Sequence, residues 1–366
     1  MNIKKWIFLS IVCGFMLFLT SCYDLTTSTQ IFPDGSCTRT IEFVGIVEDE
    51  SDIINGPYPI PQDSSWTVTY GDENHPRKSF QKRFRHVSDL NAELADKPDT
   101  LLQIHISVQL QKKFRWFNTY FRYQETYHTA DPYGLVPIND YLSEEELELY
   151  YLHGDTLDLE ERLQEWYIHS SIEYYFQQLQ TVVDSLNLQD LTAEQLNSKK
   201  ALLLEMFDKR ELNETGDRMV NQHVIEFFGS IMMSGFMTND QPSPFNHVKM
   251  LESLLGTSSV RLMSEQISRI DAEIEQKNRY ISSVSDREYT NQVTMPGLIL
   301  DTNAKELEGS TVRWQFDGNQ FFWEDHPMWV ESRVVNQWAM IVTGAVCLSL
   351  IAGLLFGTIL RRRRQI

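Results

Sequence analysis

Two histidine–carboxylate pairs have a spacing that places both side chains on one face of a helix. Glu165 and His169 are four residues apart, and His223 and Glu226 are three apart. Such pairs can bind a metal ion, and two further histidines could complete a site, His153 and His247. The same spacing is typical of a solvated pair within one helix, which contributes only about 0.2–0.5 kcal/mol. Because the sequence holds no His-Glu-x-x-His motif and no cysteine pair, we predict no metal and no cofactor.

Motifs for nucleophilic catalysis are absent from the sequence. There is no Gly-x-Ser-x-Gly elbow, no Ser-x-x-Lys box with its companion motifs and no phosphate-binding glycine loop. Asp158, Glu160 and Glu161 could supply the two carboxylates of a glycoside hydrolase. With 51 acidic residues in the chain, such neighbours are expected by chance. We therefore predict no catalytic residue.

Cys22 is the residue whose surroundings indicate a specific modification. Lys4 and Lys5 precede an apolar stretch, and small residues stand directly before the cysteine, as in a secretory signal peptide. The sequence Leu19-Thr20-Ser21-Cys22 resembles the lipobox of bacterial lipoproteins at all four positions. The resemblance implies that residues 1–21 are a cleaved signal peptide and that Cys22 becomes the first mature residue. Its thiol would carry a diacylglycerol thioether, with palmitate-type acyl chains.

A second anchor is expected at the C-terminus. The 23 residues from Trp338 to Leu360 carry no charge and are followed by Arg361, Arg362, Arg363 and Arg364. A helix of that length measures about 35 Å and crosses a bilayer. The arginines belong on the cytoplasmic side, so residues 361–366 form a cytoplasmic tail and residues 22–337 lie in the periplasm or outside the cell. A spanning helix indicates the inner membrane, and both ends of the ectodomain are expected at the same membrane face.

The ectodomain is strongly acidic. Without Lys4, Lys5 and the four terminal arginines, 26 basic residues face 51 acidic ones, a formal charge of −25. This charge argues against a nucleic-acid partner and against a face that lies flat on anionic lipid. Cys37 is the one cysteine left outside the signal, the lipid site and the spanning helix. No intramolecular disulfide is therefore expected, and Cys37 is interpreted as a buried residue on a strand.

The periodicity of apolar residues changes twice along the ectodomain. Alternating patterns predict strands over 25–31, 37–44, 66–70, 79–87, 102–110 and 114–127, with a turn at Pro33-Asp34-Gly35-Ser36. Capping boxes at Ser143 and Thr192 then begin a helical region, with helices over 157–186, 191–210, 217–236, 245–255 and 258–279. Strands return over 288–295, 310–316 and 321–335, the last two forming a hairpin around Asp317-Gly318-Asn319.

These patterns predict an α+β fold with a mixed or antiparallel sheet. The last strands are too few to stand alone, so we expect N- and C-terminal strands to complete one sheet, with the helical region as an insertion. The predicted parts are residues 22–140 (N-terminal β-rich part), 141–284 (helical insertion), 285–337 (C-terminal β part) and 338–360 (transmembrane helix). Two separate domains are the alternative.

Three short segments resemble the LppM-like bacterial envelope lipoproteins. They are Ile31-Phe32-Pro33-Asp34-Gly35-Ser36, Met295-Pro296-Gly297 and Glu308-Gly309-Ser310-Thr311-Val312-Arg313-Trp314, followed by the membrane helix and basic tail. The resemblance covers about 60 residues and consists of turn and strand residues. It implies a β-rich envelope domain and transfers no functional residue. The long helical region departs from the compact pattern of that group.

Aromatic residues gather in two places. One is the predicted helix with Trp166, Tyr167, Tyr174, Tyr175 and Phe176, and the other is the predicted strand with Trp116, Phe117, Tyr120, Phe121 and Tyr123. Such clusters mark either a ligand groove or the place where a helix packs on a sheet. Indoles favour the membrane interface, where we expect Trp329 and Trp338.

Three classes of function remain open. The leading hypothesis is a non-enzymatic binding or accessory lipoprotein at the periplasmic face of the inner membrane, with membrane lipid and an envelope protein as partners. A second is a hydrolase of cell-wall or lipid material whose site is dispersed along the sequence. A third is a lipid- or lipoprotein-handling protein, for which an apolar tunnel would be diagnostic.

Overall fold

The computed structural model describes most of the predicted ectodomain and the C-terminal helix. The described residues are 24–44, 56–60, 64–71, 77–95, 102–153, 159–186, 188, 190–208, 211–212, 218–219, 247–285, 287–322 and 324–363. The predicted signal peptide, Cys22 and the end of the basic tail lie outside these ranges, as do His223 and Glu226.

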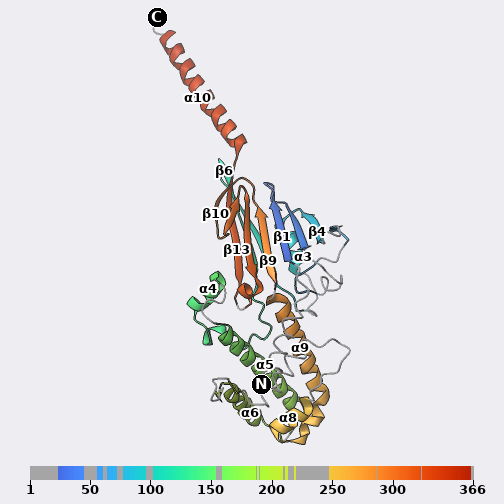
Figure 1. Ribbon diagram of the computed structural model, residues 1–366. Coiled ribbons are helices and arrows are strands. Elements are labelled where there is room, and N and C mark those ends of the chain that lie inside the picture. Colours follow the sequence, from blue (N-terminus) through green and yellow to red (C-terminus); the bar gives the residue numbers. More distant parts are fainter. Residues whose placement is uncertain are drawn as a thin grey trace, which may run out of the picture.

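Strands from both ends of the chain form a seven-stranded mixed sheet, sheet A. Its order is β11-β12-β9-β1-β2-β4-β3. β1 pairs in parallel with β9 and antiparallel with β2, so the first strand lies at the centre of the sheet between N- and C-terminal neighbours (Figure 1). The strands are β1 Asp24–Ile31, β2 Cys37–Val44, β3 Thr67–Tyr70, β4 Arg77–Phe84, β9 Glu288–Thr294, β11 Glu306–Glu308 and β12 Thr311–Asp317.

A four-stranded antiparallel sheet, sheet B, packs against sheet A. Its order is β10-β13-β6-β5. The strands are β5 Ile106–Phe114, β6 Asn118–Tyr127, β10 Leu298–Thr302 and β13 His326–Val335. The main hydrophobic core combines inward side chains of both sheets, among them Ile41, Val293, Tyr123 and Val330. The space between the sheets is thus filled by close-packed side chains.

A short helix that the sequence pattern missed covers one edge of this sandwich. It is α3, Val87–Ala95, and its buried residues Val87, Leu90 and Leu94 join the main core. The Asn91 side-chain oxygen accepts a hydrogen bond from the backbone N–H of Val108 at 2.7 Å. Because β5 is the edge strand of sheet B, this contact satisfies a backbone donor that edge strands otherwise leave unpaired.

The helical region lies at one end of the sandwich (Figure 1). Both predicted capping boxes are confirmed: the backbone N–H of Glu146 donates to Ser143 Oγ, and that of Gln195 donates to Thr192 Oγ1. A second hydrophobic core holds most of these helices together, and a third, small cluster packs the helix over residues 144–153. The elements are η1 Ile138–Asp140, α4 Glu144–His153, α5 Glu160–Leu186, α6 Ala193–Asp208, the two-residue strands β7 Glu211–Leu212 and β8 Arg218–Met219, α8 His247–Leu255, η2 Ser258–Met263 and α9 Ser264–Ser285.

The predicted hairpin around Asp317-Gly318-Asn319 is wrong. β12 belongs to sheet A and β13 to sheet B, and between them runs the 3-10 helix η3, Gly318–Phe321. The Asp317 side chain accepts the Asn319 N–H at 2.9 Å, so the turn residues cap a helical turn that carries the chain from one sheet to the other. The strand that the sequence pattern began at 321 starts at His326 instead.

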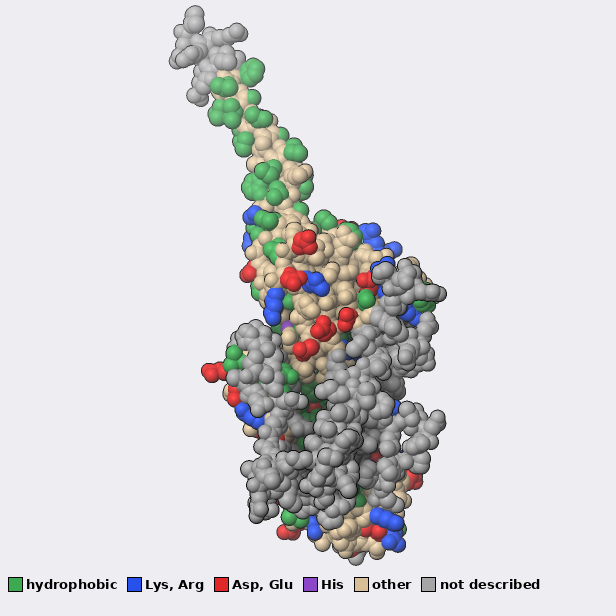
Figure 2. All heavy atoms as spheres, viewed as in Figure 1, with side chains coloured by type: hydrophobic (Ala, Val, Ile, Leu, Met, Phe, Trp, Pro, Cys, Tyr) green, Lys and Arg blue, Asp and Glu red, His purple; other side chains and the backbone are tan. Residues whose placement is uncertain are grey.

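One long apolar helix, α10 (Gln337–Arg363), leaves the sandwich at the end opposite the helical region (Figure 1). Its segment Gln337–Phe356 is long and apolar enough to cross a membrane. Figure 2 shows hydrophobic side chains exposed along its length. The α+β fold class predicted from the sequence, including this helix, is confirmed.

Candidate functional site

The base of α10 is joined to the β5–β6 hairpin by one buried asparagine. The Asn336 side chain donates to the carbonyl oxygens of Arg115 and Trp116, at 2.8 and 3.2 Å, and accepts from Thr119 Oγ1 at 2.9 Å. Its backbone N–H donates to the Phe117 carbonyl at 2.8 Å, and its own carbonyl accepts the Ala339 N–H. Asn336 therefore ends the pairing of β13 and begins α10 while holding the hairpin tip.

Four exposed aromatic rings surround this joint, and we call them the aromatic collar: Phe114, Trp116, Phe117 and Trp338. Between 47% and 55% of each is exposed. The Trp338 ring stacks on Phe114 at 6.3 Å between centroids and meets Trp116 edge-on at 5.3 Å. Trp116 Nε1 also donates to Thr343 Oγ1 on α10 at 2.8 Å. The hairpin tip thus lies along the first turns of α10.

A groove with a volume of about 610 Å³ lies beside the collar on sheet B. Its lining residues are Gln111, Lys113, Arg115, Tyr120, Phe121, Arg122, Glu331 and Ser332. Arg122 pairs with Glu331 at 3.0 Å and lies over the Trp329 ring at 5.2 Å. Within the described part of the chain, Lys113 and Arg115 are exposed and have no carboxylate at salt-bridge distance. Three cations against one carboxylate make the groove basic on an otherwise acidic ectodomain.

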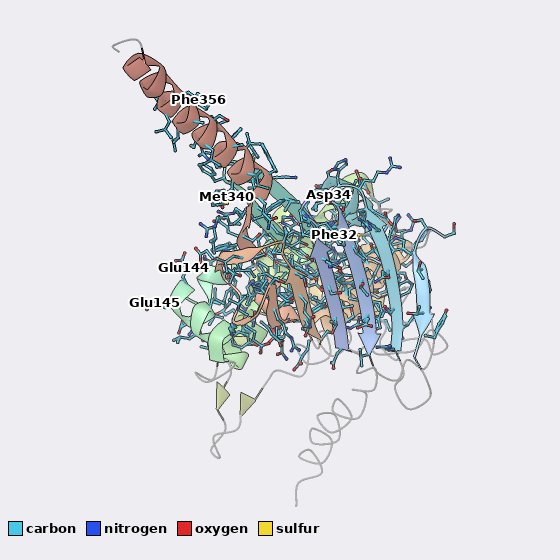
Figure 3. The ribbon with its side chains drawn as sticks, turned by 90° about the horizontal axis from the view of Figure 1, so that it is seen from above. Phe32, Asp34, Glu144, Glu145, Met340 and Phe356 are labelled. Carbon is cyan, nitrogen blue, oxygen red and sulfur yellow. The ribbon has the colours of Figure 1, made fainter. Side chains whose placement is uncertain are left out.

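The turn between β1 and β2 reaches the same end of the molecule. Lys112 Nζ donates to the Pro33 carbonyl oxygen at 2.8 Å, which ties this turn to the β5–β6 hairpin. In Figure 3, Phe32 and Asp34 mark the turn, and Met340 marks the first part of α10. Gly35 adopts a φ of 98°, as the sequence predicts for this turn. β1 consequently begins, at Asp24, at the end of sheet A away from α10.

At that opposite end, three side chains from separate segments form a serine–histidine–aspartate chain. Ser107 Oγ lies 2.9 Å from His128 Nε2, and His128 Nδ1 lies 2.9 Å from Asp325 Oδ2. Asp325 Oδ1 accepts the backbone N–H of Thr129 at 3.0 Å, which fixes the carboxylate. The order of contacts matches that of a nucleophile, a general base and an orienting acid. The side chains of His128 and Asp325 are 40% and 52% exposed, so the arrangement lies open on the outer face of sheet B.

A buried ion pair connects the two sheets. Arg39 of β2 and Glu125 of β6 are completely buried and form two parallel hydrogen bonds of 2.9 Å. Arg39 also donates to Thr29 Oγ1 and Tyr58 OH, and the Tyr123 hydroxyl donates to Glu125. Burial lowers the pKa of Arg39, but the Glu125 carboxylate together with the Tyr58 and Tyr123 hydroxyls outweighs it, and the pKa lies well above its ordinary value. The pair has no access to solvent, so we interpret it as structural.

The histidines considered as metal ligands lie apart. The His169 ring contacts the Tyr141 hydroxyl, whereas His247 Nδ1 lies 2.6 Å from Asp271. No group of three or more histidine, cysteine, aspartate or glutamate side chains among the described residues could hold a metal ion. Glu165 is half-buried on α5. The other candidates for metal binding or acid catalysis lie outside the described side chains, namely His153, Asp158, Glu160, Glu161, His223 and Glu226.

The two aromatic clusters differ in how deeply their side chains are buried. The helix cluster is buried: Trp166 joins the main core, and Tyr174, Tyr175 and Phe176 join the second core. In the strand cluster Phe121 and Tyr123 are buried, while Trp116 and Phe117 form part of the exposed collar. Trp338 lies at the base of α10, whereas Trp329 lies elsewhere on sheet B: it pairs with Gln124, six residues and about 20 Å before the end of β13.

Cys37 is completely buried on β2 with a free thiol, as the sequence predicted. Burial raises the pKa of its thiol to about 11, so Cys37 is an inert core residue rather than a nucleophile.

Comparison with known proteins finds no matching family model and no matching curated relative. One solved structure is similar, the NMR structure of the folded domain of the Mycobacterium tuberculosis LppM protein. It covers 86% of this chain and 91% of its own length, with a TM-score of 0.27 and 8% identity. A likeness at this level transfers no function to this chain.

Proposed function

We propose that this chain is a membrane-anchored envelope lipoprotein that acts as a binding or accessory protein without catalytic activity. α10 spans the inner membrane, Arg361 to Arg364 stay in the cytoplasm, and the ectodomain works in the periplasm or outside the cell. Cys22 carries the lipid. The partners are membrane lipid and an envelope protein, and no nucleic acid is bound.

The observation that carries this proposal is the apolar α10 with its fixed base. The helix is exposed along nearly its whole apolar length, and water is an unfavourable environment for so much apolar surface. Asn336 and the aromatic collar hold the helix to sheet B. Sheet B therefore presents its collar and basic groove next to the membrane.

Carbonate extraction of membranes tests the anchor. The full chain and its Cys22→Ala variant are both expected in the membrane pellet, because α10 suffices for attachment. Release of Cys22→Ala into the supernatant would refute the spanning helix. A reporter fused after Ile366 is expected to be active only in the cytoplasm, and crosslinking in intact cells should recover a defined envelope partner. A uniformly uncrosslinked monomer would contradict the accessory role.

The chain Ser107–His128–Asp325 favours a second candidate function, an esterase. Ser107 Oγ would attack an ester carbonyl carbon while His128 Nε2 takes its proton. The proton then passes to the departing alkoxide, and water releases the acyl group from Ser107 by the same route. A fluorophosphonate probe on the full chain tests this role. Labelling that disappears in Ser107→Ala and His128→Ala but persists in Ser268→Ala supports an esterase, and no labelling of the unmodified chain refutes it.

A further inference from the structure

We propose that the β5–β6 hairpin tip is a second membrane-binding element, which inserts its aromatic collar among the lipids beside α10 and holds the phosphates of anionic phospholipids in the basic groove. This inference rests on the proposed membrane anchorage. It goes further because it names a surface of the ectodomain, a lipid class and the residues that bind it.

The depth of the hairpin tip follows from one hydrogen bond. Trp116 Nε1 donates to Thr343, which stands six residues after the first residue of α10 and therefore about 9 Å along the helix. If α10 enters the bilayer at its apolar start, Trp116 lies at the depth of the headgroups and upper acyl chains. An indole is favoured at this depth because its ring is apolar and its N–H is polar.

The hairpin places three cations and three aromatic rings within six residues: Lys112, Lys113, Phe114, Arg115, Trp116 and Phe117. The collar rings are about half exposed although they are large and apolar. An exposed apolar group rimmed by charge is typical of an interaction surface. Since α10 shares the collar through Trp338, the lipid bilayer is the partner that meets helix and hairpin together.

The groove supplies the charges for the phosphates. Glu331 compensates Arg122, whereas Lys113 and Arg115 are exposed and extend from the same hairpin as the collar. The groove volume of about 610 Å³ falls within the range of about 300–1,000 Å³ typical of small-molecule sites. An anionic membrane repels the acidic remainder of the ectodomain, so the charge distribution orients the molecule with the hairpin tip and the groove toward the membrane.

The first test is native mass spectrometry of the full chain in detergent micelles, titrated with phosphatidylglycerol or phosphatidylcholine. Each cation near an anionic lipid contributes about fivefold to affinity. The double variant Lys113→Gln/Arg115→Gln is therefore expected to bind phosphatidylglycerol about 20- to 30-fold more weakly. The matched control Arg261→Gln/Arg269→Gln removes two exposed cations from η2 and α9 and is expected to bind as the unmodified chain does.

The second test measures the depth of the collar by tryptophan quenching. In vesicles of brominated phosphatidylglycerol, Trp116→Phe is expected to lose a strongly quenched component of the fluorescence. Trp329→Phe, on the sheet far from the helix base, is expected to lose an unquenched one. Equal quenching changes in the two variants would refute insertion of the hairpin.

The outcomes separate this inference from the proposed function. A chain that stays in carbonate-washed membranes but binds both lipids equally, or is unaffected by Lys113→Gln/Arg115→Gln, overturns the lipid site and leaves the anchor intact. Displacement of phosphatidylglycerol by millimolar inorganic phosphate also overturns it, because the groove would then be a site for free phosphate. Loss of the chain from washed membranes instead overturns the proposed function itself.

Discussion

Removing the charge of Glu125 should destabilise the ectodomain more than any surface substitution. In the sandwich the carboxylate accepts two hydrogen bonds from the Arg39 guanidinium and a third from Tyr123. Glu125→Gln leaves the Arg39 charge in a dry core without its counterion. Breaking a buried pair on one side costs about 3–5 kcal/mol, and Arg39→Met is expected to cost a similar amount because it leaves the carboxylate uncompensated.

The combined variant gives the decisive result. Arg39→Met/Glu125→Gln removes both charges, so no uncompensated ion remains. The hydroxyls of Thr29 and Tyr58 still lose their Arg39 donors, at about 1–3 kcal/mol for each group left unsatisfied, whereas the amide oxygen of the glutamine can still accept from Tyr123. We therefore expect the double variant to cost about as much as one single variant, far less than the sum of both.

Urea unfolding of the full chain in detergent micelles, followed by near-ultraviolet circular dichroism, measures these free energies. The matched control is the i,i+4 pair Arg269–Glu265, whose side chains are 75% and 73% exposed. The corresponding Arg269→Met and Glu265→Gln changes are expected to cost less than about 0.5 kcal/mol each and to add. Additive costs at Arg39 and Glu125 as well would refute the argument that the core holds a coupled ion pair.

Three other perturbations test the sheets and the helix base. Burial lowers the pKa of His326 to about 4. Between pH 6.5 and pH 4 the unfolded chain, in which the pKa of this histidine is near 6.5, binds a proton at His326 that the folded chain does not bind. This contribution to stability is therefore complete above pH 6.5 and falls by up to about 3 kcal/mol toward pH 4. The urea midpoint of His326→Gln should therefore fall less between pH 7 and pH 4.5 than that of the unmodified chain. Gly297 has a φ of 83°, and a Cβ there would lie 2.3 Å from the Arg333 carbonyl oxygen. Gly297→Ala should lower the free energy of unfolding by more than about 2 kcal/mol, and Gly309→Ala, with a φ of 62° in open space, by about 1 kcal/mol. Asn336→Ala removes three side-chain hydrogen bonds at about 1 kcal/mol each, so amide exchange over residues 115–119 should accelerate at least tenfold while exchange in β9 stays unchanged.

Local signals predicted the local structure. The turn at Asp34 and Gly35, the capping boxes at Ser143 and Thr192, and the alternation at Ile104, Ile106 and Val108 all depend on neighbours within a few residues. The structure confirms each of them. The sequence also predicted that N- and C-terminal strands share a sheet, as β1 and β9 do across more than 260 residues. It could not show that the strands divide into two sheets, with β12 in one and β13 in the other, because such pairings depend on distant residues.

The sites depend on these distant pairings. Ser107, His128 and Asp325 meet only because β5, β6 and β13 are neighbours, and no short motif relates them. The buried ion pair does leave a signal in the sequence. Arg39 lies on the same face of its strand as Cys37 and Ile41, and Glu125 lies on the same face as Tyr123 and Tyr127. A charge at an inward position on each of two strands is what a buried pair requires.

The direction of β1 bears on the expectation that lipid and helix hold the ectodomain at one membrane face. β1 begins at Asp24, away from α10, and its eight residues span about 26 Å at about 3.3 Å each. Two residues from Asp24 back to Cys22 extend over at most about 7 Å. With the strands along the membrane normal, a lipid on Cys22 would start at least about 15 Å above the level of the β1–β2 turn. To reach the bilayer that α10 is proposed to cross, the ectodomain would have to tip over and separate Trp116 from Thr343.

Crosslinking with a short bis-maleimide between these two positions distinguishes the arrangements. In Trp116→Cys/Thr343→Cys the reagent replaces the reach of the indole, whose Nε1 contacts Thr343 when the hairpin lies along α10. We expect the crosslink to form in native membranes to the same extent with Cys22 present or replaced by alanine, because the Asn336 joint and not the N-terminus sets the orientation. A crosslink that forms only in the Cys22→Ala background would show that the lipid pulls the ectodomain over. If mass spectrometry finds Cys22 acylated in chains that crosslink fully, its acyl group must lie outside the bilayer that α10 crosses.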